Sequence, residues 1–485
     1  MKCLLLLLAI ICSPLTVYAQ IVEALSSDKS DYNLNFHPKY NRVVLARSDN
    51  HFSNAKVIQY SRSNEGEFTH PIELKLGPNQ FKYTDPMYAP NGKHLYFVTD
   101  RPLNGDATSR HLNLWQATLK QGLAQDIAPL LMHINLDNDA LGPERHNDKL
   151  FFTQIENGQY KIMVNNESAK KTEPFNSIPI DKHVTARSDI TFSPDGKVAV
   201  FWQTTKSSNH ADLYASRHHK GKWSAPIKLK GDVNSAHHEI TPQFSVDAKW
   251  LYYSSNRPEP GYALFNIHKV STKSAFPDNW YQAHFAPKKL NLLSHHSSVK
   301  DITAFSYTVT LEINGTKSSE RVYVRYQPFR LTSVRQGVRY EINAKSGEKI
   351  NLSNHTTERL STSEVKNEIK RLRQNFIDLL KQPQTKLYRQ YSYEPSQFIY
   401  RIEAPLVEPF SILVDEKRKK ILKLFYDDGG VGHEMDYRAV KGILWPFKFT
   451  YQQDGKTIAS GEFSNLCISY SSDKANAQKG ECSIE

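Results

Sequence analysis

Hydrophobic and polar positions alternate in short runs along the first half of the chain, and turn residues separate the runs. This pattern is typical of β-strands. Residues 192–197 show it clearly, because an apolar strand leads into Pro194-Asp195-Gly196, which suits a tight hairpin turn. Three further strands are predicted after this turn, at Val198–Trp202, Asp212–Ser216 and Ala225–Leu229. The pattern therefore predicts a unit of four antiparallel strands.

The unit is repeated through the first half of the chain. Its turn position recurs about every 52 residues, at Pro38, Pro90, Pro143, Pro194 and Val246. The copy at Gly142-Pro143-Glu144 is the weakest. Four strands at this period indicate a β-propeller, because blades stacked around an axis cover each other's faces. We expect about five blades, with a sixth, eroded blade as the alternative.

A propeller ring needs a closing contact between its first and last blades. Ile21 to Leu25 has the same pattern as the fourth strands at Ile72–Leu76 and Ile227–Leu229. We therefore expect it to complete the last blade, with Lys288–Leu293 as the competing candidate.

From about residue 296 the repeat stops, and one helix is predicted among many strands. Ser361-Thr362-Ser363-Glu364 has the pattern of a capping box, and apolar residues follow it at helical spacing as far as Leu380. Strands are predicted before the helix at Phe305–Ile313, Arg321–Tyr326 and Val338–Ile342, and after it at Leu387–Tyr393, Phe398–Glu403, Phe410–Val414, Ile421–Tyr426, Glu434–Val440, Leu444–Tyr451 and Thr457–Leu466. The prediction is thus an all-β propeller over 20–295 followed by an α+β domain over 296–485.

The N-terminal residues 1–19 have the pattern of a cleaved signal peptide. Lys2 precedes an apolar run, and Val17-Tyr18-Ala19 places small residues at the cleavage site. The run is shorter than the roughly 20 residues that span a bilayer. We expect a periplasmic or secreted protein. In that oxidising setting a disulfide between Cys467 and Cys482 is favoured, with two unpaired buried thiols as the alternative.

The repeat resembles a known family of propellers. Phe192 to Lys197, with Tyr252–Pro258 and Val98–Pro102, is similar to the strand–turn–strand signature of the periplasmic WD40-like propellers (PD40 repeat) typified by the Tol-system propeller protein. The resemblance covers about residues 21–295. It implies a binding platform whose loops contact an envelope protein or a cell-wall polymer.

The second half resembles another family. Phe410–Asp415, Ile421–Tyr426 and Met435–Pro446 are similar to the periplasmic lipoprotein-carrier superfamily. The resemblance implies a half-barrel curved around a helix, with a lipid or acyl chain as ligand. The chain departs from this family because its helix lies midway through the domain.

Four aromatic residues are the candidate ligand-binding residues of this half-barrel. Trp445, Phe447, Phe449 and Tyr451 alternate along one predicted strand and therefore project to one face. They form either the wall of an apolar cavity or the face that packs on the helix. Lys417 to Lys420 is interpreted as a solvated turn, with a phospholipid headgroup contact as the alternative.

No catalytic residue, metal site or cofactor is predicted. The chain lacks the Gly-x-Ser-x-Gly pattern of serine hydrolases, and His433 to Tyr437 stops short of the His-Glu-x-x-His of zinc proteases. His237-His238-Glu239 is interpreted as a surface loop rather than a set of metal ligands. Asp85, Asp189 and Glu239 lie shortly before first strands and could approach the propeller axis, as the carboxylates of glycosidases do.

Charge and composition add one exclusion. The formal net charge is +12 and the pI is about 9.2, but no dense basic run with interleaved aromatic residues predicts a nucleic-acid partner. The leading hypothesis is a non-enzymatic envelope binding protein. The alternatives are a carbohydrate-active enzyme with a site on the propeller axis and a structural component of an envelope complex.

Overall fold

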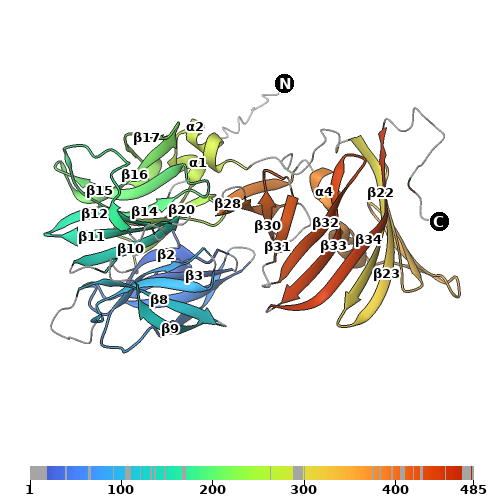
Figure 1. Ribbon diagram of the computed structural model, residues 1–485, viewed down its shortest axis with the longest axis horizontal. Coiled ribbons are helices and arrows are strands. Elements are labelled where there is room, and N and C mark those ends of the chain that lie inside the picture. The colour runs from blue at the N-terminus through green and yellow to red at the C-terminus, as the bar shows by residue number, and fades with distance from the viewer. Residues whose placement is uncertain are drawn as a thin grey trace, which may run out of the picture.

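The computed structural model shows two parts, a ring of small sheets and one large curved sheet (Figure 1). It describes residues 19–287, 299, 301–471 and 482, except 39–40, 64–66, 91, 104–110, 121, 131–133, 136–137, 147–148, 167–170, 263, 374–375, 382–383, 395–396, 405–409, 419, 427–429 and 454. The predicted signal peptide apart from Ala19, and the competing closing segment Lys288–Leu293, lie outside these residues.

The first part is a propeller of five blades, as predicted. Each blade is an antiparallel sheet with its first strand innermost. The blades are β2–β5 (Ser30–Phe36, Arg42–Ser48, Lys56–Arg62, Phe68–Glu73), β6–β9 (Tyr83–Tyr88, His94–Thr99, Asn113–Lys120, Leu123–Pro129), β10–β13 (Asp139–His146, Lys149–Glu156, Gln159–Asn166, Lys171–Pro174), β14–β18 (Val184–Phe192, Val198–Thr205, Ser208–His219, Lys222–Trp223, Ile227–Lys228) and β19–β21 (Glu239–Phe244, Trp250–Ser255, Asn266–Ser271) with β1 (Gln20–Ile21).

The N-terminal segment closes the ring. β1 pairs with β21 of the last blade, where Ile21 lies opposite His268, and the Val22 N–H donates to the Ile267 carbonyl at 2.7 Å. The short helix η1 (Glu23–Leu25) follows, and its Leu25 is fully buried between the last and first blades. The prediction that this segment closes the ring is confirmed, but the strand that completes the last blade is Gln20–Ile21, and Glu23–Leu25 is a helix and not part of a fourth strand.

The Pro-Asp-Gly turn fits between two blades. The Asp195 carboxylate accepts from the Ser193 hydroxyl at 2.7 Å and from the Lys197 N–H at 3.0 Å, which holds the turn. Gly196 has φ +67°, and a Cβ placed on it would lie 2.2 Å from His146 Nε2 of the preceding blade. Glycine is therefore required both for the conformation and for the close approach.

The weakest copy of the repeat was misaligned. Pro143 lies inside β10, next to the bulge that interrupts this strand, and not at a hairpin turn. The last pair of β10 and β11 is His146 with Lys149, so the hairpin lies after His146 and the predicted turn was too early in the sequence. Pro143 corresponds instead to Pro86 and Pro242, which also follow a bulge residue. A proline is tolerated there because a bulge interrupts the ladder of backbone hydrogen bonds.

After the last blade, three short helices pack against blades four and five. They are α1 (Thr272–Ala275), α2 (Asp278–Trp280) and η3 (Tyr281–Phe285). Phe276 and Phe285 pack with Phe244 of β19. His284 contacts the Asp195 carboxylate at 2.7 Å, so this segment extends the core of the propeller.

The second part is one antiparallel sheet of 13 strands with two helices. The sheet order is β27-β26-β25-β24-β23-β22-β34-β33-β32-β31-β30-β29-β28. The strands are β22 (Ile302–Ile313), β23 (Thr316–Tyr326), β24 (Phe329–Arg335), β25 (Val338–Asn343), β26 (Gly347–Asn351), β27 (Thr357–Arg359), β28 (Lys386–Glu394), β29 (Gln397–Glu403), β30 (Phe410–Asp415), β31 (Lys420–Phe425), β32 (Val431–Val440), β33 (Ile443–Gln453) and β34 (Lys456–Tyr470).

The predicted helix is present as α3 (Thr362–Arg373) and α4 (Phe376–Lys381), which connect the two edges of the sheet. The capping box forms as predicted: the Glu364 N–H donates to the Ser361 hydroxyl at 3.2 Å, and the Glu364 carboxylate accepts from the Ser361 N–H at 2.7 Å. Val365 and Ile369 of α3 and Leu379 of α4 pack against one face of the sheet. We call this the helix-covered face. The sheet with its helices matches the predicted half-barrel.

The two parts meet at the turn before β20. The Lys249 ammonium pairs with Glu403 of β29 and lies 4.3 Å from the ring of Tyr388 on β28. β28 is an edge strand of the large sheet, so this contact lies at a place where unpaired strand edges need protection. None of the helices in the described part of the chain has the length and apolar character that crossing a bilayer requires.

Candidate functional site

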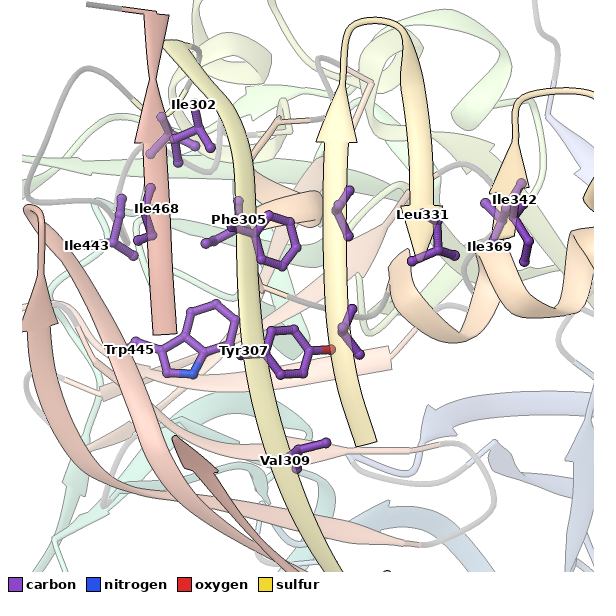
Figure 2. Close-up of a cluster of buried hydrophobic side chains, with 14 of the residues drawn as sticks. Ile302, Phe305, Tyr307, Val309, Leu331, Ile342, Ile369, Ile443, Trp445 and Ile468 are labelled. Atoms are coloured by element: carbon purple, nitrogen blue, oxygen red, sulfur yellow. The ribbon is translucent and has the colours of Figure 1, made fainter. Parts of the chain in front are cut away.

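The helix-covered face carries two separate apolar clusters. The larger one packs under α3 and joins β22–β25 to β33 and β34, with Phe305, Tyr307, Leu331, Ile369 and Trp445 among its members (Figure 2). The smaller one packs under α4 and joins β28–β31, with Leu379, Tyr400, Ile402, Phe410 and Ile412 among its members. The two clusters lie on either side of β32 in the sheet order.

Trp445, the first of the four predicted aromatic residues, is a core residue. Only 2% of its surface is exposed. Its ring lies 6.1 Å from that of Tyr307 (Figure 2). It also makes an edge contact with the ring of Phe463 at 5.5 Å. Its location matches the packing interpretation, in which the aromatic face lies against the helix and the sheet core.

The other three aromatic residues are only partly buried. Phe449 contacts Phe463 at 5.4 Å, and Tyr451 contacts Tyr426 of the smaller cluster at 5.6 Å. Phe447 packs on the edge of the larger cluster, with the Arg438 guanidinium 4.6 Å from its ring. These side chains therefore run from the larger cluster toward the smaller one along β33.

Glycine makes room for this aromatic row. Phe449 lies opposite Gly461 on β34, and a Cβ at Gly461 would be 2.2 Å from the end of the Phe449 ring. In an antiparallel pair a ring can cover a glycine in this way, which stabilises a position that otherwise lacks packing. Any larger residue at 461 would push Phe449 away from β34.

The middle of β32 interrupts the apolar lining between the clusters. Its positions on the helix-covered face are Gly432, opposite Leu424 and Tyr451, and Glu434, opposite Phe449. Residues directly opposite each other in a sheet share a face. Between the two clusters, therefore, the sheet contributes a hydrogen atom and a carboxyl group in place of apolar side chains.

Two polar atoms on this face lack partners in the described part of the chain. One is Glu434 Oε2, a buried acceptor, and the other is Trp445 Nε1, a buried donor. Burial raises the pKa of the Glu434 carboxyl to about 7. Buried polar atoms are nearly always hydrogen bonded in folded proteins, to protein, water or ligand. The sequence analysis did not select Glu434. The available signal was its place in the predicted strand Glu434–Val440, which comes directly before the strand that carries the four aromatic residues.

The propeller axis is the second place where chemistry-bearing residues meet. The innermost strand of each blade has a bulge, and the residue at each bulge has a φ between 46° and 54°. These five residues are Asn33, Asp85, Gly142, Asp189 and Thr241. They line a cavity of about 40 Å³ on the axis.

The bulge residues join neighbouring blades. The Gly142 N–H donates to Asp85 Oδ2 at 2.8 Å, and the Asn33 N–H donates to the Thr241 hydroxyl at 3.3 Å. Gly142 itself leaves room for the next blade, since a Cβ there would lie 2.5 Å from Asp189 Oδ1. The bulges thus turn backbone N–H groups toward side chains of the adjacent blade.

Two of the three predicted axial carboxylates, Asp85 and Asp189, line this cavity together with Glu144. Asp189 accepts from Trp202 Nε1 at 2.6 Å, and Glu144 accepts from the Thr191 hydroxyl at 3.1 Å. Burial, with a further contribution from the charge of Asp85, raises the pKa of Asp189 to about 7; burial raises that of Glu144 to about 8. The cavity has room for about three water molecules and not for a sugar ring.

The prediction that Glu239 lies with these carboxylates was wrong. Glu239 is fully buried at the start of β19, where it accepts from the Arg257 guanidinium at 3.0 Å and the Ser235 hydroxyl at 2.6 Å. The residue of this blade that corresponds to Asp85 and Asp189 is Thr241, two positions later. Glu144 was missed because of the misaligned third copy, although Asp85-Pro86, Gly142-Pro143 and Thr241-Pro242 carry the correct alignment.

The remaining motifs occupy ordinary structural positions. His238 Nδ1 accepts from the Ala211 N–H at 3.1 Å. His433 and Glu434 are neighbours on β32 and project to opposite faces, so they do not converge on one metal. The Lys417–Lys420 segment forms the hairpin between β30 and β31, in which Lys419 lies outside the described residues.

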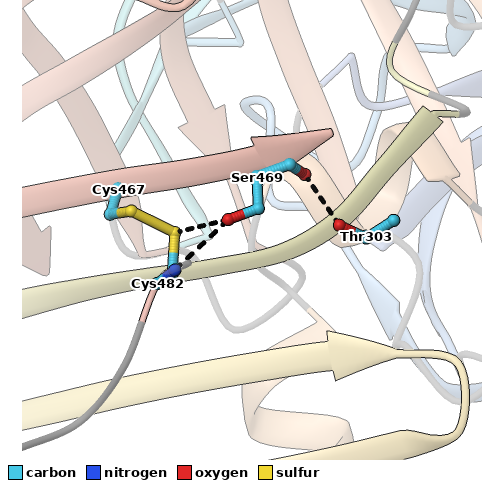
Figure 3. The surroundings of a disulfide bond; sticks show 4 residues. All are labelled: Thr303, Cys467, Ser469 and Cys482. Carbon is cyan, nitrogen blue, oxygen red and sulfur yellow. Dashed lines mark hydrogen bonds between the residues drawn. A yellow bond between two sulfur atoms is a disulfide. The ribbon is translucent and has the colours of Figure 1, made fainter. Parts of the chain in front are cut away.

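A disulfide joins Cys467 of β34 to Cys482 (Figure 3). The Ser469 hydroxyl accepts from the Cys482 N–H at 3.2 Å, and the Thr303 hydroxyl of β22 donates to the Ser469 carbonyl at 3.3 Å. The disulfide therefore fixes Cys482 at the β22–β34 pair. These are the first and last strands of the large sheet in sequence order, and they are neighbours inside it.

Comparisons with known proteins return both kinds of fold that the sequence suggested. No family model matches the chain, and a search of curated proteins finds no match. Among solved structures, the chain is similar to a putative TolB from Agrobacterium tumefaciens (12% identity, 51% of this chain and 79% of that one, TM-score 0.33). It is also similar to a LolA superfamily protein from Nitrosomonas europaea (10% identity, 37% of this chain and 91% of that one, TM-score 0.26).

A third similarity is to the GH32 β-fructofuranosidase BmSUC1 from Bombyx mori (11% identity, 68% of this chain and 86% of that one, TM-score 0.38). These TM-scores are too low to assign a fold from the comparisons. The propeller and the half-barrel are therefore assigned from the strand order within the chain's own sheets.

Proposed function

We propose that the chain is a non-enzymatic binding protein of the cell envelope whose half-barrel holds an apolar ligand on its helix-covered face. The observation that carries this proposal is the interrupted lining at β32. Two apolar clusters flank Gly432 and Glu434, while Phe449 and Tyr451 remain partly exposed beside them. Partly exposed aromatic rings next to a gap in an apolar lining are typical of ligand sites.

The propeller would act as the partner-binding part of the molecule. Its axial carboxylates accept hydrogen bonds within and between blades, and its axial cavity is small, which favours a platform over a catalytic channel. The disulfide supports a location in an oxidising compartment. An envelope protein or cell-wall polymer contacting the loops between blades is the proposed partner.

Native mass spectrometry of protein purified without detergent tests the ligand. We expect a chain carrying one amphiphilic molecule, which organic extraction releases and identifies. The Gly432→Leu variant should lose it, because a leucine there would fill the space beside Leu424 and Tyr426, whose atoms lie 3.4–3.7 Å from a Cβ at this position.

His433→Leu is the matched control, since it adds a similar apolar side chain one residue along, on the opposite face of β32. A wild-type protein that carries no small molecule, even after incubation with an envelope lipid extract, would contradict the proposal. So would equal occupancy in the wild type and Gly432→Leu.

A further inference from the structure

We propose that Glu434 recognises the polar end of the ligand, so that the helix-covered face prefers single-chain amphiphiles with a protonated amine over fatty acids. This inference rests on the proposed function and deepens it by naming the ligand's chemical class.

Two independent pairings place Glu434 on the ligand face. It lies opposite Phe449, which packs on the larger cluster. It is also two residues from Gly432, which lies opposite Leu424 of the smaller cluster. Because residues i and i+2 of a strand share a face, both routes give the same orientation. The carboxyl group therefore stands between the two apolar clusters.

The protein supplies no cation to this carboxyl group in the described part of the chain. Glu434 Oε2 is buried without a hydrogen-bond partner. Arg438, the only cationic side chain on β32 besides the imidazole of His433, pairs with Asp436 at 2.5 Å and lies over the ring of Phe447. Tyr437 donates its hydroxyl hydrogen to the Ile421 carbonyl. Burial is the only cause of the raised pKa of Glu434, with no contribution from a nearby charge, so the described residues bring no cation to this carboxyl group and a ligand can supply one.

A ligand amine satisfies this position. An ionised carboxylate in an apolar lining is unfavourable unless it is paired, and a protonated amine supplies both an opposite charge and hydrogen-bond donors. A fatty acid would instead bring a second negative charge to the same place. Burial raises the pKa of the Glu434 carboxyl to about 7, so the group is largely ionised at pH 8, where alkylamines are still protonated.

Competition with matched twelve-carbon compounds tests the inference. The neutral probe N-phenyl-1-naphthylamine is bound to the full chain at pH 8 and displaced by dodecylamine, dodecanol or dodecanoate below their micelle concentrations. We expect dodecylamine to compete at least about tenfold better than dodecanoate, the effect of one charge-assisted hydrogen bond. Glu434→Gln should reduce this preference to less than about twofold and leave dodecanol unchanged.

Glu462→Gln is the matched control, because it removes the same charge from β34 on the opposite face, where Glu462 is exposed and pairs with Lys448. Glu434→Asp keeps the charge and should keep the preference, which separates the charge from a folding defect. If the probe binds saturably but dodecylamine and dodecanoate compete equally well, the role of Glu434 is overturned and the proposed function is not. Failure of the wild type to bind the probe would overturn the proposed function as well.

Discussion

Leu25→Ala tests whether the N-terminal segment closes the propeller. Leu25 is fully buried in η1 and packs in the cluster that joins the last and first blades. β1 itself has only two residues, so a large part of the closing contact must come from the side chains that follow it. Removing three carbons from Leu25 should therefore weaken the ring as a whole, and not only the N-terminus.

The expected loss follows from the burial. Leu→Ala at fully buried positions lowers the free energy of unfolding by about 2–5 kcal/mol. With a urea dependence of about 1–3 kcal/mol per molar, the midpoint should fall by about 1 M or more. Glu23→Ala is the matched control on the same turn, since Glu23 is exposed and should change stability by less than about 0.5 kcal/mol.

Tryptophan fluorescence during urea unfolding is a suitable assay. The chain has six tryptophans, and all except Trp445 lie in the blades or in α2, at Trp115, Trp202, Trp223, Trp250 and Trp280. The signal therefore reports mainly on the propeller. If Leu25→Ala and Glu23→Ala unfold at the same urea concentration as the wild type, the N-terminal segment does not hold the ring closed.

Three further predictions concern the axis, the disulfide and α3. Because the pKa of Asp189 (about 7) and that of Glu144 (about 8) are raised above ordinary carboxyl values, the native state binds more protons and propeller stability should fall from about pH 5 to about pH 8. Urea midpoints of an Asp189→Asn, Glu144→Gln double variant should depend less on pH. Cys482→Ser should lower half-barrel stability by about 3 kcal/mol in thermal unfolding, given the 15-residue separation from Cys467. Ser361→Ala should cost about 1 kcal/mol and raise amide exchange in the first turn of α3.

Local patterns in the sequence predicted the elements whose signals are local. The Pro194-Asp195-Gly196 turn and the Ser361 capping box form with the expected hydrogen bonds. The closing role of Ile21 to Leu25 was also predictable, because this segment repeats the pattern of other blades. Each of these depends on residue types within a few positions of one another.

Contacts between distant segments were harder to predict. Nothing in the β22 or β34 sequence indicates that the two pair, and this pairing turns the halves of the second domain into one sheet. Three short strands, β24, β26 and β27, were also missed. Glu434 belongs to this class, since its place between the two apolar clusters depends on the pairing of β32 with β31 and β33.

The most direct test of the proposed function is a titration of the chain with N-phenyl-1-naphthylamine. The account predicts saturable binding of one probe per chain in the wild type and in His433→Leu, and its loss in Gly432→Leu, which fills the gap between the two apolar clusters. Binding that does not saturate, or that is equal in Gly432→Leu and the wild type, would contradict an apolar ligand site on the helix-covered face.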